Sequence, residues 1–173
     1  MIIINNPNNT TGAPIPNQTL KRIAQVAEEN GSTLFSDEVY RPLFDGGAAG
    51  QTEGPQPVTT LGYEKTLVTG SMSKGYALAG IRVGWIASKD KSIISAIMAA
   101  RDYTTISVSQ IDDRIASYAL SPAVRPSLVD RNLALARTNA KLLKDFILRY
   151  ESVCSWVEPT AGTTAFIRFS KNG

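Results

Sequence analysis

The residues best suited to chemistry lie in one short stretch, 70–85, around a lysine flanked by glycines, Lys74. Two hydroxyl side chains, Ser71 and Ser73, come just before the lysine, and Arg82 follows it. Serine hydroxyls are small hydrogen-bond donors, and arginine offers a planar set of donors that matches a phosphate group. The stretch therefore predicts a phosphate site with a lysine beside it.

The elements that must position Lys74 are two strands, because the segments 66–69 and 81–86 are short, apolar and rich in β-branched residues. The lysine is then expected in the loop between them. An amine beside a bound phosphate suits a cofactor that carries both a phosphate and an aldehyde, which describes pyridoxal phosphate held as a Schiff base. Taken alone, however, a lysine in a loop of serine and glycine is more often a solvated surface side chain.

The same residues offer a second interpretation, because Ser71 and Lys74 also form a Ser-x-x-Lys motif. Penicillin-binding proteins and serine β-lactamases use this motif as a nucleophile, but they place the serine at the start of a helix and carry Ser-Asp-Asn and Lys-Thr-Gly elements later in the chain. Gly75 and Gly80 oppose a helix here, and neither later element is present. This alternative is therefore set aside.

Composition and charge restrict the class of protein. The chain has 173 residues, of which 43% are hydrophobic and 19% charged, as expected for a soluble globular domain with a real core. The net charge of +3 is small and scattered, so no nucleic-acid partner is expected. The chain has no histidine, which excludes histidine-based triads and the usual zinc and iron sites within it, so no metal is expected. The single cysteine, Cys154, lies in an apolar run and is interpreted as a buried thiol.

Targeting signals are not evident in the sequence. No secretory signal and no apolar run of membrane-spanning length are visible, so a cytoplasmic protein without a membrane partner is expected. The chain opens directly on an apolar segment, 2–4, that is typical of a buried strand. Because domains rarely begin in the middle of a sheet, we expect that upstream sequence is missing.

The first forty residues predict a βαβ unit. A strand at 2–4 is followed by a helix at 17–29, where apolar residues recur at helical spacing, and by a strand at 32–36. This order implies parallel strands, and ligands bind at the carboxyl ends of such strands. Asn9, Asp37 and the lysine loop all follow strand ends, so we expect them to lie close together.

The remainder of the chain predicts one long loop followed by helices and two strands. Glycines and prolines concentrate at 41–58, which is expected to be the loop. The other expected elements are a helix capped by Ser88 and ending near 103, a helix at 109–120 capped by Ser109, a long helix within 122–150 that starts near Pro126, and strands at 153–157 and 164–169.

Three motifs, in order, resemble those of the fold-type I pyridoxal phosphate enzymes, specifically the class I/II aminotransferases. They are Asn-Pro-Asn-Asn-Thr-Thr-Gly at 6–12, Ser-Asp-Glu-Val-Tyr at 36–40, and Ser-Met-Ser-Lys with Leu-Ala-Gly-Ile-Arg-Val-Gly-Trp within 71–85. The resemblance implies an α/β fold, a three-layer αβα structure with a mainly parallel sheet, as in the large domain of these transferases, followed by the start of a small α+β domain. It implies a partial cofactor-binding large domain at 1–135 and the opening of a C-terminal small domain at 136–173.

The resemblance also implies three catalytic residues. Lys74 would form the Schiff base and then transfer the proton between substrate and cofactor as general base and acid. Asp37 would pair with the pyridine nitrogen and keep it protonated, so that the ring accepts electrons. Tyr40 would hydrogen-bond the phenolic oxygen of the ring.

Four further residues would complete the cofactor site by the same resemblance. Asn9 would share the phenolic oxygen with the tyrosine, Ser71 and Arg82 would hold the phosphate, and Ser73 is an additional phosphate candidate. The family usually has proline where this chain has Thr10, so the turn after Asn9 loses a constraint on φ. Glu38, beside the expected catalytic aspartate, is interpreted as structural.

The resemblance predicts transfer of an amino group between an amino acid and a 2-oxo acid in a protein that forms a homodimer. The Gly-rich phosphate loop and stacked aromatic residue that the family carries upstream, and its carboxylate-binding arginine downstream, are not matched, so these 173 residues alone are expected to be a fragment that could be inactive. Two alternatives stay open. One is other pyridoxal phosphate chemistry on amino acids, by a C–S lyase, decarboxylase or cyclase. The other is a non-catalytic effector module or pseudoenzyme.

Overall fold

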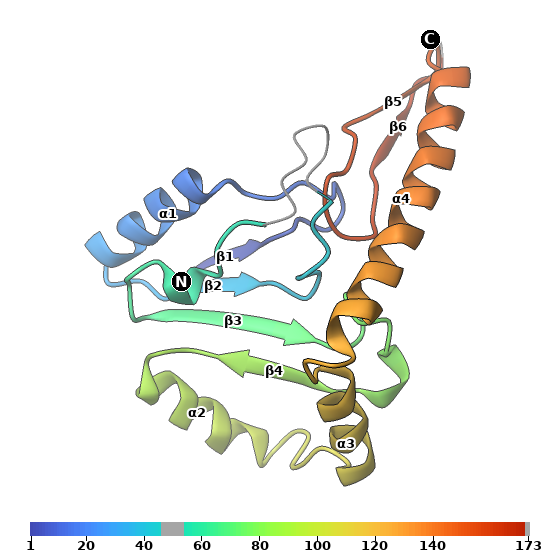
Figure 1. Cartoon of the computed structure of the whole chain (residues 1–173). Helices are drawn as coiled ribbons and strands as arrows, with labels where there is room; N and C mark the ends of the chain where they lie inside the picture. The colour runs from blue at the N-terminus through green and yellow to red at the C-terminus, as the bar shows by residue number, and fades with distance from the viewer. Residues whose placement is uncertain (46–53, 172–173) are drawn as a thin grey trace.

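The core of the computed structural model, which describes residues 1–45 and 54–171, is a four-stranded sheet in the order β1-β2-β3-β4 (Figure 1). Strands β1 (Ile2–Asn5), β2 (Leu34–Asp37) and β3 (Thr66–Ser71) are parallel to one another. Strand β4 (Gly84–Ala87) returns antiparallel to β3. The sheet is therefore mainly parallel, in agreement with the α/β fold expected from the sequence.

Helix α1 (Asn17–Glu29) connects β1 to β2, which confirms the βαβ unit. Its apolar face carries Leu20, Ala24 and Ala27, all buried against Leu34 of β2 and Val58. The opposite face of the sheet is open at β1, where Ile3 is 65% exposed. Side chains alternate between the two faces of a strand, so one face of β1 packs against α1 and the other is exposed.

Among the helices that follow β4, α2 begins at a different residue from the one expected. Helix α2 (Lys91–Arg101) begins after Asp90, whose side chain accepts hydrogen bonds from the backbone N–H groups of Ser92 and Ile93, so the expected Ser88 cap was wrong. The Ser88 hydroxyl instead donates to the Thr66 carbonyl at 2.6 Å, which ties the end of β4 to β3. The same hydroxyl accepts a hydrogen bond of 3.1 Å from the backbone N–H of Asp90, so Ser88 connects the sheet to the residue that caps α2.

Helix α3 (Gln110–Ala119) is capped by Ser109, as expected. Helix α4 (Arg125–Arg149) carries its proline in the first turn, where a missing N–H group costs no helical hydrogen bond. It leads to a hairpin of β5 (Cys154–Trp156) and β6 (Ile167–Phe169), both shorter than the expected strands. Cys154 is buried. The expected domain boundary at 135/136 falls inside α4 and stays a prediction.

Strand β4 also begins later than expected from the apolar run at 81–86. Residues Ala79–Ile81 form a short 3₁₀ helix, η3, and Arg82 has a φ of 54°, in the left-handed region. Because a left-handed residue cannot continue an extended strand, β4 begins only at Gly84.

The long loop expected at 41–58 is described only in part, since residues 46–53 lie outside the described residues. Its end forms a short 3₁₀ helix, η2 (Val58–Thr60), and Val58 is fully buried against α1. No helix among the described residues combines the length and the apolar character needed to cross a lipid bilayer.

The carboxyl ends of β1, β2 and β3 all point toward α4, which crosses that end of the sheet (Figure 1). The three loops that follow these strands therefore meet at one edge, between the sheet and α4. These loops carry the residues that the sequence singled out.

Candidate active site

Asp37 is the last residue of β2, and its side chain is held by the neighbouring strand. The Thr69 hydroxyl donates a hydrogen bond of 2.9 Å to Oδ1 of Asp37, and the backbone N–H of Val39 donates to the same oxygen at 3.3 Å. The parallel register pairs Asp37 with Thr69, which places the hydroxyl at the carboxylate. Within residues 1–45 and 54–171, no hydrogen bond occupies Oδ2, so this half-buried carboxylate has an oxygen free for a ligand.

The loop after β1 lies beside Asp37 through Asn5 and Asn9. The Asn5 side chain donates to the Asp37 carbonyl at 2.9 Å, and its Oδ1 accepts a hydrogen bond from the backbone N–H of Asn9. Asn5 thus bridges the ends of β1 and β2. Asn9 is exposed, and its side chain makes no hydrogen bond to the part of the chain that the structure describes.

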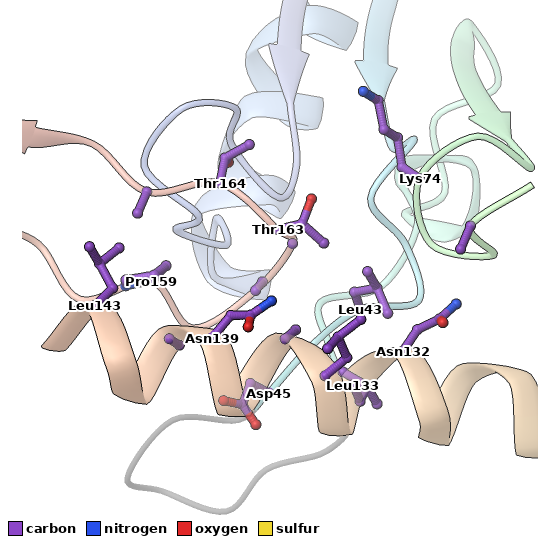
Figure 2. A pocket seen from close by; sticks show the side chains of 17 residues that line it. Leu43, Asp45, Lys74, Asn132, Leu133, Asn139, Leu143, Pro159, Thr163 and Thr164 are labelled. Carbon is purple, nitrogen blue, oxygen red and sulfur yellow. The ribbon is translucent and has the colours of Figure 1, made fainter. Parts of the chain in front are cut away.

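Tyr40 and Lys74 come from different loops and lie together. Tyr40 is 3% exposed, and the Lys74 amine lies 5.9 Å from the centre of its ring. The amine itself is exposed and points away from α4 (Figure 2). Gly162 also lies against the tyrosine, because a Cβ there would lie 3.4 Å from the ring, and its φ of 70° favours glycine.

The three phosphate candidates lie on the turn between β3 and β4. Ser71 pairs with Gly84 across the ladder, and the next backbone hydrogen bond joins Met72 to Val83, the residue after Arg82. The Ser71 hydroxyl accepts a hydrogen bond of 2.9 Å from the Ser73 backbone N–H.

The guanidinium of Arg82 is not bonded to either serine. It is exposed and donates to the Ala79 carbonyl at 3.0 Å. The structure therefore places this arginine on the same β3–β4 connection as the two serines, with its charged group directed at its own turn.

An ion pair between the buried Glu38 and the partly exposed Arg41 supports the turn that carries Asp37 and Tyr40. Glu38 bonds the Arg41 guanidinium at 2.9 Å and accepts a hydrogen bond of 3.2 Å from the Val58 backbone N–H. Burial raises the pKa of the Glu38 carboxyl above its ordinary value, and the charge of Arg41 opposes that rise. These contacts agree with the structural role given to Glu38 from the sequence.

Sequence reasoning missed three side chains that hold this site, namely Asn5, Thr69 and Asn132. Asn132 lies on α4 and donates a hydrogen bond of 3.0 Å to the carbonyl of Gly75, the residue after Lys74. A polar residue on the inward face of a long amphipathic helix is the one signal that could have indicated Asn132. Nothing local indicates the partners of Asn5 and Thr69, because both depend on strand register.

A cavity of about 390 Å³ opens beside Lys74, between α4 and the segment that joins β5 to β6 (Figure 2). This is the size of a small-molecule site. Its walls are largely apolar, with a few polar groups from α4 and from the β5–β6 segment. The residues named in the figure are Leu43, Asp45, Lys74, Asn132, Leu133, Asn139, Leu143, Pro159, Thr163 and Thr164.

Comparison with known proteins gives one family. The model of the family described as aminotransferase class I and II matches residues 1–168. Capreomycidine synthase of Streptomyces vinaceus is 26% identical over 170 residues, which cover 98% of this chain and 41% of that protein. The aspartate/prephenate aminotransferase of Thermus thermophilus is 30% identical over 148 residues, covering 85% and 36%.

A solved structure agrees with these relatives. The chain superimposes on a PLP-dependent aminotransferase from Streptococcus suis with a TM-score of 0.85 and 32% identity, over 98% of this chain and 42% of the other. The chain thus spans about two fifths of the length of the proteins that it matches.

Proposed function

The chain belongs to the aminotransferase class I and II family, and from this premise we propose that it forms the cofactor-binding part of an enzyme that transfers an amino group between an amino acid and a 2-oxo acid. The cofactor would be pyridoxal phosphate. The observation that carries the proposal is that Asp37 and Tyr40, from the end of β2, and Lys74, from the loop after β3, all lie at the carboxyl edge of the sheet.

The residues present fit this cofactor by their donor and acceptor chemistry. A carboxylate with one oxygen held and the other free suits a protonated ring nitrogen, and Asp37 supplies it. Tyr40 and Asn9 would bind the phenolic oxygen, and Lys74 would bind the aldehyde carbon covalently. Ser71, Ser73 and Arg82 would bind the phosphate, once the arginine turns from the Ala79 carbonyl toward it.

Pyridoxal phosphate, when bound, supplies an electron-accepting ring for chemistry at the substrate α-carbon. The chain itself supplies proton transfer and orientation. Lys74, as a free amine, would remove the proton from the substrate α-carbon and deliver it to the cofactor carbon that carries the amino group. Both transfers require that the amine stay near the substrate. Tyr40 would hydrogen-bond the phenolic oxygen of the cofactor, and the burial of Tyr40 keeps the tyrosine ring in place. The homodimer expected from the resemblance is part of the same proposal.

The test is the visible absorption of the purified protein with added pyridoxal phosphate, before and after borohydride. A visible band that borohydride removes, and that Lys74→Ala lacks, is the expected result. Lys65→Ala is the matched control, because Lys65 is exposed and precedes β3 at the opposite end of that strand. A band of equal strength in Lys74→Ala would contradict the assignment of Lys74, and no band in a folded wild type would contradict cofactor binding.

One observation supports a second reaction class, since one of the relatives that match nearly the whole chain is named a synthase and not an aminotransferase. A cyclase, lyase or decarboxylase could use the same lysine. The products separate these reactions. Formation of a 2-oxo acid together with a new amino acid indicates transamination, whereas a cyclic amino acid, an amine with carbon dioxide, or pyruvate with ammonia indicates one of the others.

A further inference from the structure

Asn132 is the buried polar residue of α4, at 8% exposure, and it reaches across to the loop that carries Lys74. Its Nδ2 donates a hydrogen bond of 3.0 Å to the carbonyl of Gly75, a partner 57 residues away in the sequence. A buried amide is costly unless it is hydrogen-bonded, so this contact fixes where the loop can lie against α4. Gly75 directly follows Lys74, so the contact acts on the backbone of the lysine.

The other side of Gly75 is closed by the turn that follows Tyr40. A Cβ at Gly75 would lie 2.8 Å from the Arg41 carbonyl oxygen and 2.9 Å from Cδ of Pro42, so the loop and the turn touch backbone to backbone. The loop is thus held between this turn and α4. Within it, the backbone N–H of Ala77 donates to the Lys74 carbonyl at 3.1 Å, which removes further freedom from the lysine.

The orientation of the Asn132 amide is set by its neighbour. The Arg131 guanidinium donates from Nε and from a terminal nitrogen to Oδ1 of Asn132, at 3.3 and 3.2 Å. Because the guanidinium only donates, the oxygen of the amide faces Arg131 and the NH₂ group faces Gly75. The donor is therefore directed at the loop before any ligand binds.

We propose that Asn132 is a positioning residue for Lys74, which holds the Gly75 carbonyl so that the lysine amine stays beside the Tyr40 ring. Asn132 touches no reacting atom and acts only through the loop backbone. The inference rests on the proposed function, since it assigns to Asn132 the placement of the amine that would bind the cofactor. A small misplacement of a reacting group lowers the reaction rate strongly. Loss of this contact should therefore lower kcat more than it changes substrate binding.

The experiment compares Asn132→Leu and Asn132→Ala with Thr138→Leu and Thr138→Ala, all made in the full-length protein. Thr138 is a matched control, because it is an exposed polar residue of α4 outside the residues that line the cavity, and its hydroxyl bonds the Ala134 carbonyl of the same helix. The alanine variants serve if a leucine variant does not fold. Circular dichroism and melting temperature establish folding for each.

Two readouts are taken. The first uses no cofactor and measures amide hydrogen exchange in residues 72–78. The second is a pH titration of the visible band of the cofactor bound at Lys74, together with kcat and KM. We expect faster exchange, a shifted titration midpoint, and a kcat lower by about 10- to 100-fold with a much smaller change in KM, for the Asn132 variants alone.

The outcomes are distinct. A folded Asn132 variant with the wild-type midpoint and a kcat within about twofold of wild type would overturn the inference and leave the proposed function intact. Equal effects in the Thr138 variants would also overturn it, since they would show a general effect of α4. A wild type that forms no borohydride-sensitive band would remove the proposed function, and the inference with it.

Discussion

The hydroxyl of Thr69 donates a hydrogen bond of 2.9 Å to Oδ1 of Asp37 across two neighbouring parallel strands. A hydrogen bond to a charged group is worth about 1.5–3 kcal/mol, and this one also fixes the direction of the carboxylate. The proposed ring-nitrogen partner is therefore held by a residue outside the motifs that identify the family.

This contact predicts that Thr69→Val weakens binding of pyridoxal phosphate. Valine keeps the shape of the side chain and removes the donor, so Asp37 loses its orientation. We expect the Kd for the cofactor to rise by about tenfold or more, measured by absorbance titration. Thr60→Val is the control, because it removes an exposed hydroxyl that bonds only the Pro57 carbonyl. Equal Kd values for Thr69→Val and wild type would show that Thr69 has no part in the site.

The pH dependence of stability should carry a contribution from Glu38. Burial raises the pKa of this carboxyl in the folded state above its ordinary value of about 4.5, so the folded protein binds the proton more tightly than the unfolded chain does. The contribution is therefore fully present below about pH 4.5 and is lost as the pH rises through the folded-state pKa.

The corresponding measurement is the free energy of unfolding in urea, at pH values from 4 upward in steps, for wild type and Glu38→Gln. Glutamine keeps the acceptor but cannot titrate. We expect the stability of the wild type, relative to the variant, to fall as the pH rises across this range. A difference that stays constant or grows with pH would contradict the raised pKa.

Gly162 is predicted to be sensitive to alanine for two separable reasons. Its φ of 70° costs a non-glycine residue roughly 1 kcal/mol, and an added Cβ would lie 3.4 Å from the Tyr40 ring. Gly31→Ala is a matched control, since Gly31 has a φ of 59° with no atom within 4 Å of the added carbon. Urea unfolding should show a similar loss of stability in both variants, whereas only Gly162→Ala should weaken cofactor binding. Equal cofactor binding in the two would argue against contact between Gly162 and Tyr40 in the loaded enzyme.

The core beneath α1 predicts a large effect for Leu34→Ala. Leu34 is fully buried between β2 and α1, and removal of such a side chain costs about 2–5 kcal/mol in the free energy of unfolding. Ile3→Ala is the control, because Ile3 is paired with the residue next to Leu34 but lies on the open face of the sheet. Its substitution should change stability by less than about 0.5 kcal/mol, measured in the same urea experiment. Comparable losses at both positions would indicate that the open face is also covered in solution.

Much of the fold could be predicted from the sequence because its signals are local. The apolar spacing of α1 predicted its bounds, 17–29, and Ser109 is a cap that the structure confirms. The position of Lys74 between two strands followed from the short apolar runs on either side. The motifs also predicted the family, which the comparison with known proteins confirms.

The expected cap of α2 and the expected start of β4 were wrong because the local sequence allows more than one conformation at each place. Ser88 and Asp90 are both suitable helix caps, and the choice depended on the Thr66 carbonyl of a neighbouring strand, which takes the Ser88 hydroxyl. Arg82 interrupts an apolar run that is typical of a strand, because its backbone turns into the left-handed region. In both cases a contact or conformation outside the local pattern decided the outcome.

The sequence by itself determined which residue types are available at the strand ends, and through the motifs it indicated Asp37, Tyr40 and Lys74 as candidates. Only the tertiary structure decided which side chains hold them. Thr69 meets Asp37 through strand register, and Asn132 meets Gly75 because α4 crosses the edge of the sheet. These pairs are 32 and 57 residues apart. Helical and strand periodicity describe only near neighbours along the chain, so partners at such separations are defined only once the elements have packed together.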